Sequence, residues 1–150
     1  MTLLRGSSWA EIEAPIRDCW AVVADVTRAP EWQRGLESVE VVERDEQGRA
    51  LVCDTVTDAK ITKVRCRIRV TYAPPHRLAF TRIESDDVDE MQASWELEEI
   101  RGGAGTRATY TLGVDPGPVP FLARPLVRAL SPLVLGGRAQ ELARAVAARG

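Results

Sequence analysis

Residues 63–72 alternate strictly between two kinds of side chain. One set is basic and the other is largely apolar: Lys63, Arg65, Arg67 and Arg69 against Val64, Cys66, Ile68, Val70 and Tyr72. A period of two residues is that of a β-strand, whose side chains point to opposite faces of a sheet. The chain must therefore build a sheet with one wet face and one buried face, and another element must cover the buried face.

Six further segments are predicted to be strands of the same antiparallel sheet, at residues 8–13, 36–45, 49–58, 77–84, 91–100 and 107–114. Turn residues separate them, most clearly the glycine-rich run at 102–105 and the Pro74-Pro75 pair. If residues 58–61 form the turn before the strand at 63–72, Cys53 is expected opposite Cys66 and Asp54 opposite Arg65. The sheet then has seven strands.

Three helical segments accompany these strands. Residues 16–24 carry an apolar stripe after Pro15, and a second short helix is predicted at 26–32, so that two short helices follow the first strand. Residues 119–149 form the last segment, about 45 Å long if wholly helical and long enough to cross the sheet. Pro125 and Pro132 are expected to divide its first half. The fold class is therefore α+β, in a single domain over residues 1–150.

Composition indicates the cellular compartment of the protein. Three cysteines with no close pair favour neither a disulfide framework nor a zinc site, which fits a reduced cytoplasm. No apolar run approaches the roughly 20 residues of a membrane span, and the N-terminus lacks the pattern of a secretion signal. We therefore expect a cytoplasmic protein, either a monomer or a homodimer.

Charge excludes one class of partner. A net charge of −2 provides no field for nucleic acid. The segment after Pro118 is locally basic, with five arginines against Glu141 alone. We interpret those arginines as a solvated helix face, which leaves peripheral contact with a membrane open.

Several short motifs, in this order and spacing, resemble the START-like superfamily, and within it the polyketide cyclase/dehydrase and coenzyme Q-binding branch. They are Ala14-Pro15, the Trp20 helix ending at Ala24-Asp25-Val26, Pro30-Glu31-Trp32, Val39-Glu40-Val41 and Gly105-Thr106. The resemblance extends from about Ser8 to Ala147. It implies a helix-grip fold, in which a strongly curved antiparallel sheet wraps a long C-terminal helix and leaves a deep apolar pocket between them.

In such a fold the inward positions are candidate ligand-binding residues, and about half of them are expected to touch a ligand. They are Trp32, Cys66, Ile68, Val70, Phe80, Arg82, Met91, Trp95, Tyr110, Leu126, Leu130 and Val134. Trp32 and Trp95 would offer flat apolar contact to a ring or polyene. Arg82 either points inward at the rim or pairs with the acidic stretch that follows it, and we favour the second interpretation.

Catalytic groups are scarce. His76 is the only histidine and adjoins two prolines, which argues against a histidine-based triad or metal cluster. Aromatase/cyclases of the resembled family place an arginine in the pocket, but the inward positions of the central strand here are Cys66, Ile68 and Val70. A thiol in an apolar strand is inert, so Cys66 is assigned to packing. We predict no catalytic residue, no metal and no cofactor.

Three functions remain. The leading hypothesis is binding or carriage of a small hydrophobic molecule such as a lipid, a quinone or a polyketide-like aromatic. The alternative is a polyketide cyclase or dehydrase using Tyr110, Arg82 or Asp54 at the rim, although the alternation places Asp54 on the outer face. The third is a protein or ribosome interaction module that uses the basic terminal helix, as in some relatives of the resembled branch.

Overall fold

A computed structural model describes residues 4–58, 63–115, 117 and 137–149. The elements follow the predicted order and confirm the α+β helix-grip class, with a seven-stranded sheet and a C-terminal helix. They are β1 (Leu4–Ile12), α1 (Ile16–Val23), the 3-10 helix η1 (Val26–Glu31), β2 (Leu36–Arg44), β3 (Ala50–Asp58), β4 (Lys63–Ala73), β5 (Arg77–Glu84), β6 (Glu90–Ile100), the 3-10 turn η2 (Arg101–Gly103), β7 (Gly105–Asp115) and α3 (Arg138–Arg149).

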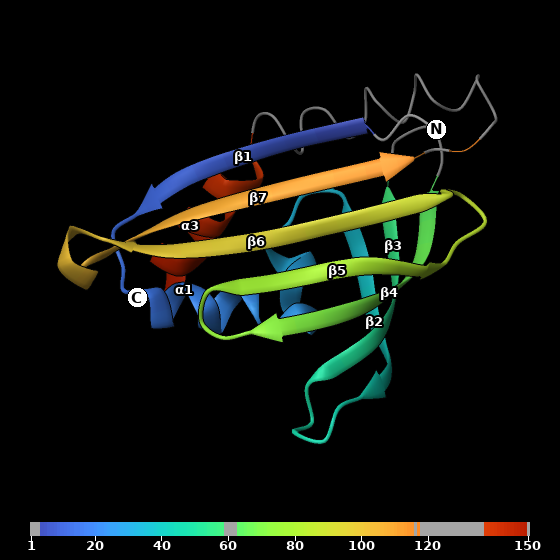
Figure 1. Ribbon diagram of the computed structural model, residues 1–150, viewed down its shortest axis with the longest axis horizontal. Coiled ribbons are helices and arrows are strands. Elements are labelled where there is room, and N and C mark those ends of the chain that lie inside the picture. Colours follow the sequence, from blue (N-terminus) through green and yellow to red (C-terminus); the bar gives the residue numbers. More distant parts are fainter. Residues whose placement is uncertain (1–3, 59–62, 116, 118–136, 150) are drawn as a thin grey trace.

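The sheet is antiparallel throughout, in the order β1-β7-β6-β5-β4-β3-β2. It curves strongly, so that β2 to β4 turn away from the long strands β1, β7 and β6, and α1 and α3 lie on the same side of it (Figure 1). At its two edges the strands differ. β1 pairs in unbroken register with β7, whereas the pairing of β2 with β3 shifts at three places.

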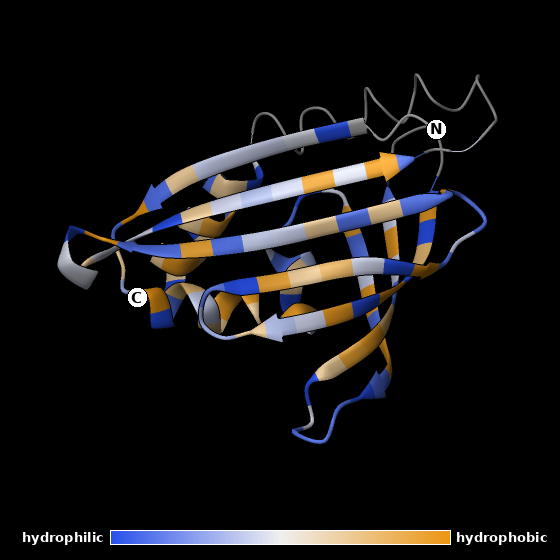
Figure 2. Cartoon of the chain, viewed as in Figure 1, coloured by the Kyte–Doolittle hydropathy of each residue, from blue (hydrophilic) through white to orange (hydrophobic). Residues whose placement is uncertain are grey.

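The alternation of β4 has the predicted effect. Cys66, Ile68 and Val70 are buried, and the arginines between them lie on the outer face. Strands β6 and β7 repeat the pattern, as the bands of polar and apolar residues along them show (Figure 2). The inward side chains form one core with the buried face of α1. Burial of apolar surface of this kind is the main favourable term in folding.

Two of the short motifs meet in space. The hydroxyl of Thr106, fully buried at the start of β7, donates a hydrogen bond of 2.8 Å to the carbonyl of Ala14. Pro15 then precedes the first turn of α1, where its missing N–H costs nothing. The bond fixes the bend between β1 and α1, and it explains why residues 92 positions apart belong to one pattern.

Helix α3 is tied to the sheet at its first turn. The N–H of Ala139 donates to the hydroxyl of Ser8 on β1 at 2.9 Å, and Glu141 accepts a 2.8 Å bond from the N–H of Arg34, which precedes β2. Leu142 is fully buried in the core that α3 shares with α1 and β1. The helix therefore bridges the two edge regions of the sheet.

The predicted register of the hairpin between β3 and β4 is wrong by two residues. Cys53 lies opposite Ile68, and Thr55, not Cys53, lies opposite Cys66. Pairing continues to Asp58 and Lys63, the last described residues of the two strands at this end. A shift of two keeps every side chain on its predicted face.

The same shift changes the partner of Asp54. Arg67 lies opposite it, in place of the predicted Arg65, and its Nε donates to the carboxylate at 2.7 Å. Both side chains are about two-fifths exposed on the outer face, as the alternation predicts. The first half of the predicted C-terminal helix, with Pro125 and Pro132, lies outside the described residues.

Shortening Leu142 tests the attachment of α3. Leu142→Ala removes a buried side chain next to α1 and β1, and we expect the free energy of unfolding to fall by about 2–5 kcal/mol in urea denaturation. The matched control is Arg144→Ala, an exposed position on the same helix, with an expected change within about 0.5 kcal/mol. Equal effects of the two substitutions would contradict the packing of α3.

Candidate functional site

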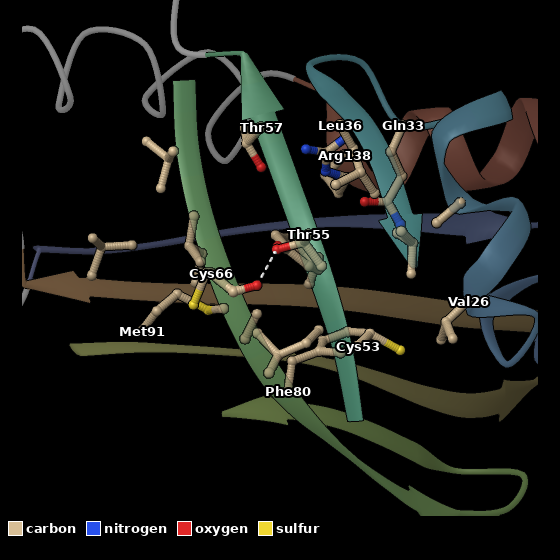
Figure 3. A pocket seen from close by; sticks show the side chains of 18 of the residues that line it. Val26, Gln33, Leu36, Cys53, Thr55, Thr57, Cys66, Phe80, Met91 and Arg138 are labelled. Carbon is tan, nitrogen blue, oxygen red and sulfur yellow. Dashed lines mark hydrogen bonds between the residues drawn. The ribbon is translucent and has the colours of Figure 1, made fainter. Parts of the chain in front are cut away.

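A cavity of about 140 Å³ lies on the concave side of the sheet, bordered by β2 to β7, the end of α1, η1 and the first residue of α3. Most of its walls are aliphatic or sulfur-bearing side chains (Figure 3). The lining residues are Val23, Val26, Ala29, Gln33, Leu36, Val39, Cys53, Thr55, Thr57, Val64, Cys66, Ile68, Phe80, Val88, Met91, Ala93, Tyr110, Leu112, Val114 and Arg138.

Five of the predicted ligand-binding residues line this cavity: Cys66, Ile68, Phe80, Met91 and Tyr110. They come from four neighbouring strands, whose inward positions the alternation brings together. The predicted residues Leu126, Leu130 and Val134 lie outside the described part of the chain.

Three other predicted wall residues are buried or partly buried near the cavity but do not line its described walls: Val70, Trp32 and Trp95. The two tryptophan rings are 5.9 Å apart between centroids, and Trp95 lies 4.9 Å from the ring of Tyr110. Trp95 therefore packs against Tyr110, which lines the cavity. Alternation predicts which face a side chain occupies, but not its depth beneath the cavity wall.

Arg82 stabilises a loop. Its Nε donates to the carbonyl of Val88 at 2.9 Å and its Nη2 to the carbonyl of Ser85 at 3.0 Å. These acceptors belong to the acidic stretch after β5, but they are backbone carbonyls, so the predicted pairing with acidic side chains is not what the structure shows. Since Val88 lines the cavity, Arg82 helps to hold its wall.

Arg138 is a charged residue of the cavity wall that sequence reasoning missed. It is 5% exposed, so our interpretation of the terminal arginines as a solvated face is wrong for this residue, whereas Arg144 and Arg149 are exposed. Its Nη1 donates to Glu141 at 2.8 Å and to the carbonyl of Arg34 at 3.2 Å, and its guanidinium carbon lies 5.8 Å from the Tyr110 ring centroid. One sequence feature could have indicated an ion pair of Arg138: Glu141, the one acidic residue of a basic segment, lies three positions after it.

Few other polar groups reach the cavity. Gln33, Thr55 and Thr57 contribute polar side chains, and Thr55 already donates its hydroxyl hydrogen to the carbonyl of Cys66 at 3.0 Å. Sequence reasoning did not single these residues out, although the threonines follow from the alternation of β3 with Cys53.

The ionisable groups of the wall stay protonated near neutral pH. Burial raises the pKa of the Cys66 thiol from its ordinary 9.0 to about 11, and it also raises the pKa of Cys53. The pKa of Tyr110 is raised by burial too, against a smaller opposing effect of Arg138. These groups can pack or donate a hydrogen bond, but a buried thiol is a poor nucleophile.

Neither a metal-binding cluster nor a membrane-spanning helix is found in the part of the chain that the structure describes. No group of three or more His, Cys, Asp or Glu side chains there could hold a metal ion. No helix among the same residues is long and apolar enough to cross a membrane.

One known protein family matches most of the sequence. The family described as polyketide cyclase / dehydrase and lipid transport matches residues 12–142. The chain belongs to this family. The match includes every described lining residue of the cavity. No functionally curated protein matches the sequence significantly.

Solved structures share the fold of this polyketide cyclase/dehydrase and lipid transport family member. A Thermus thermophilus protein is 24% identical with a TM-score of 0.81, covering 98% of this chain and 99% of its own. The ZhuI aromatase/cyclase of a Streptomyces species is 16% identical with a TM-score of 0.78, over 99% and 96%. A START superfamily protein of Mycobacterium smegmatis is 19% identical with a TM-score of 0.68, over 92% and 98%. At these identities the likeness shows the fold alone.

The raised pKa of Cys66 predicts a pH dependence of stability. The folded protein keeps a proton that the unfolded chain loses near pH 9, so the free energy of unfolding should fall as the pH rises from about 9 to about 11. Cys66→Ala removes this contribution, and its unfolding free energy, measured by urea denaturation, should decline less steeply over that range. Some decline should remain in the variant, because the pKa values of Cys53 and Tyr110 are also raised. Parallel declines in the two proteins would contradict the assignment.

Proposed function

We propose that this protein binds or carries a small hydrophobic molecule, such as a lipid, a quinone or a polyketide-like aromatic, in the cavity between the sheet and α3. The observation that carries the proposal is the composition of the wall. Apolar side chains dominate it, and the few polar side chains, mainly Gln33 and Arg138, could orient a bound molecule.

The volume of the cavity admits a compact ligand. A dry apolar cavity of roughly 150 Å³ is enough to bind a benzene-sized ring. The described walls enclose about 140 Å³. Their phenyl and thioether groups, Phe80 and Met91, offer adaptable contact to a ring.

A cyclase or dehydrase is the second candidate, and one observation favours it. Arg138 and Tyr110 bring two polar groups to the same cavity, which is the convergence that such a reaction needs. The described wall lacks a group poised to exchange protons near neutral pH, since burial keeps Tyr110 and Cys66 protonated. Asp54, considered at the rim, faces outward in its ion pair with Arg67. Binding is therefore the proposal that the geometry supports better.

The interaction-module hypothesis needs an exposed apolar patch beside the terminal arginines. The large exposed apolar side chains among the described residues are Trp9, Val42 and Ile83, on β1, β2 and β5. They lie on three separate strands and do not form such a patch on α3.

Native mass spectrometry tests the proposal directly. Protein purified without detergent should carry additional noncovalent mass, and denaturation should release an apolar molecule that can be identified. The contrary result is an empty protein whose unfolding temperature is unchanged by lipids, quinones and aromatic polyketides.

Filling the cavity gives a second test. Ala93 lines it from β6, so Ala93→Leu should occupy ligand volume and weaken binding of the co-purified molecule by about tenfold or more, measured by calorimetry. Ala79→Leu is the matched control: Ala79 precedes Phe80 on β5 and belongs to the opposite face, where it should leave affinity unchanged. Equal affinities of both variants and the unaltered protein would place the ligand elsewhere.

A further inference from the structure

The described wall of the cavity carries three sulfur-bearing side chains. Cys53 and Cys66 contribute thiols from β3 and β4, and Met91 contributes a thioether from the start of β6. Peroxides oxidise both kinds of group. The three residues differ in access, since Cys53 is fully buried and Cys66 is 7% exposed, whereas Met91 is only partly buried. Met91 is therefore the most accessible sulfur-bearing residue of this wall.

Protonation protects the two thiols from oxidation. The reactive form of a cysteine is the thiolate, not the thiol. Burial raises the pKa of Cys66 to about 11, so that about one Cys66 thiol in 10,000 is ionised at pH 7, and burial raises the pKa of Cys53 as well. A thioether has no proton to lose, and its sulfur stays reactive near neutral pH. The usual order of reactivity between cysteine and methionine is thereby reversed in this wall.

A sulfoxide at position 91 places a polar oxygen in an apolar part of the wall. Met91 lies opposite Val114 of β7, which also lines the cavity. Figure 3 shows Met91 well apart from Gln33, Thr57 and Arg138, whose side chains carry hydrogen-bond donors. An apolar ligand would bury the sulfoxide oxygen without a donor, and burial of an unpaired acceptor costs free energy.

We propose that Met91 is a site of oxidation by hydroperoxides, and that its sulfoxide lowers the affinity of the cavity for apolar molecules. The sulfur attacks the terminal oxygen of the hydroperoxide, the S–O bond forms and the O–O bond breaks. The proton of the attacked oxygen passes to the leaving oxygen, which departs as an alcohol or, from hydrogen peroxide, as water. The thioether is oxidised by two electrons and the peroxide is reduced by two. Oxidation needs no bound ligand, whereas the loss of affinity rests on the proposed binding function.

Hydrogen peroxide at neutral pH tests the site in the unaltered protein. Peptide mass mapping should find one added oxygen on Met91 before any on Cys53 or Cys66. The other methionine of the sequence, Met1, lies outside the described residues and in a different tryptic peptide, so the masses distinguish the two. Met91 should react within about tenfold of its rate in the urea-unfolded chain. A slower reaction, or earlier oxidation of either thiol, overturns the assignment.

Indane, a compact apolar probe, tests the consequence for binding. Nuclear magnetic resonance titration should show an affinity about tenfold weaker in the oxidised protein than in the untreated protein. Treatment with the two methionine sulfoxide reductases, one for each epimer, should restore the affinity. Met91→Leu conserves volume, so it should bind indane within about twofold of the unaltered protein and should not respond to peroxide.

A double variant is the matched control. Met91→Leu combined with Gln92→Met moves the thioether by one residue, to an exposed position of β6. Because successive strand residues face opposite sides of the sheet, this thioether lies on the outer face. It should be oxidised readily and leave the affinity for indane unchanged within about twofold. A tenfold loss of affinity in this variant would overturn the role of the cavity wall.

The outcomes separate this inference from the proposed binding function. If the unaltered protein does not bind indane, the binding of compact apolar molecules falls and the loss of affinity falls with it, while the peptide masses still decide whether Met91 is oxidised. If indane binds equally before and after complete oxidation of Met91, the inference is overturned and the binding function stands.

Discussion

The placement of α3 against the sheet depends on its first turn, which is hydrogen-bonded to two segments distant in sequence. Ser8 accepts from Ala139 across 131 residues, and the Arg34 backbone bonds both Glu141 and Arg138 across more than 100. Closing such long loops costs entropy, which buried hydrogen bonds and the packing of Leu142 must offset. Because these bonds place α3 against β1 and the η1–β2 region, they also bring the guanidinium of Arg138 to the cavity.

The alternation of the strands determines both which side chains form the cavity wall and how its ionisable groups behave. Strict alternation turns the apolar sides of β4, β6 and β7 toward one interior, and the same burial keeps the Cys66 thiol and the Tyr110 phenol protonated. A wall of this kind selects ligands by shape and by a small number of hydrogen bonds. This is the physical basis for assigning binding ahead of catalysis.

Much of the fold could be predicted from local patterns, because strand faces and helix starts are local properties. The burial of Cys66, Ile68 and Val70 follows from period two alone. The register of the β3–β4 hairpin was mispredicted because alternation cannot determine it. A shift of two residues keeps every side chain on the same face, so both registers fit the same pattern. The site was predicted only in part. Glu141, three positions after Arg138, was a local sign of its ion pair, but the contact of Arg138 with the backbone of Arg34, 104 residues away, follows from no local pattern.

The irregular pairing of β2 has a consequence for how copies of this protein meet. An open sheet exposes a row of unpaired backbone groups at its rim, and a flat rim can recruit a strand from another molecule. The register shifts of β2 interrupt that row, and its exposed Glu40 and Glu43 place like charges where two such edges would meet. At the opposite rim, β1 is in contact with α3. The fold can thus keep its sheet open while β2 offers only an interrupted edge to a strand of another molecule.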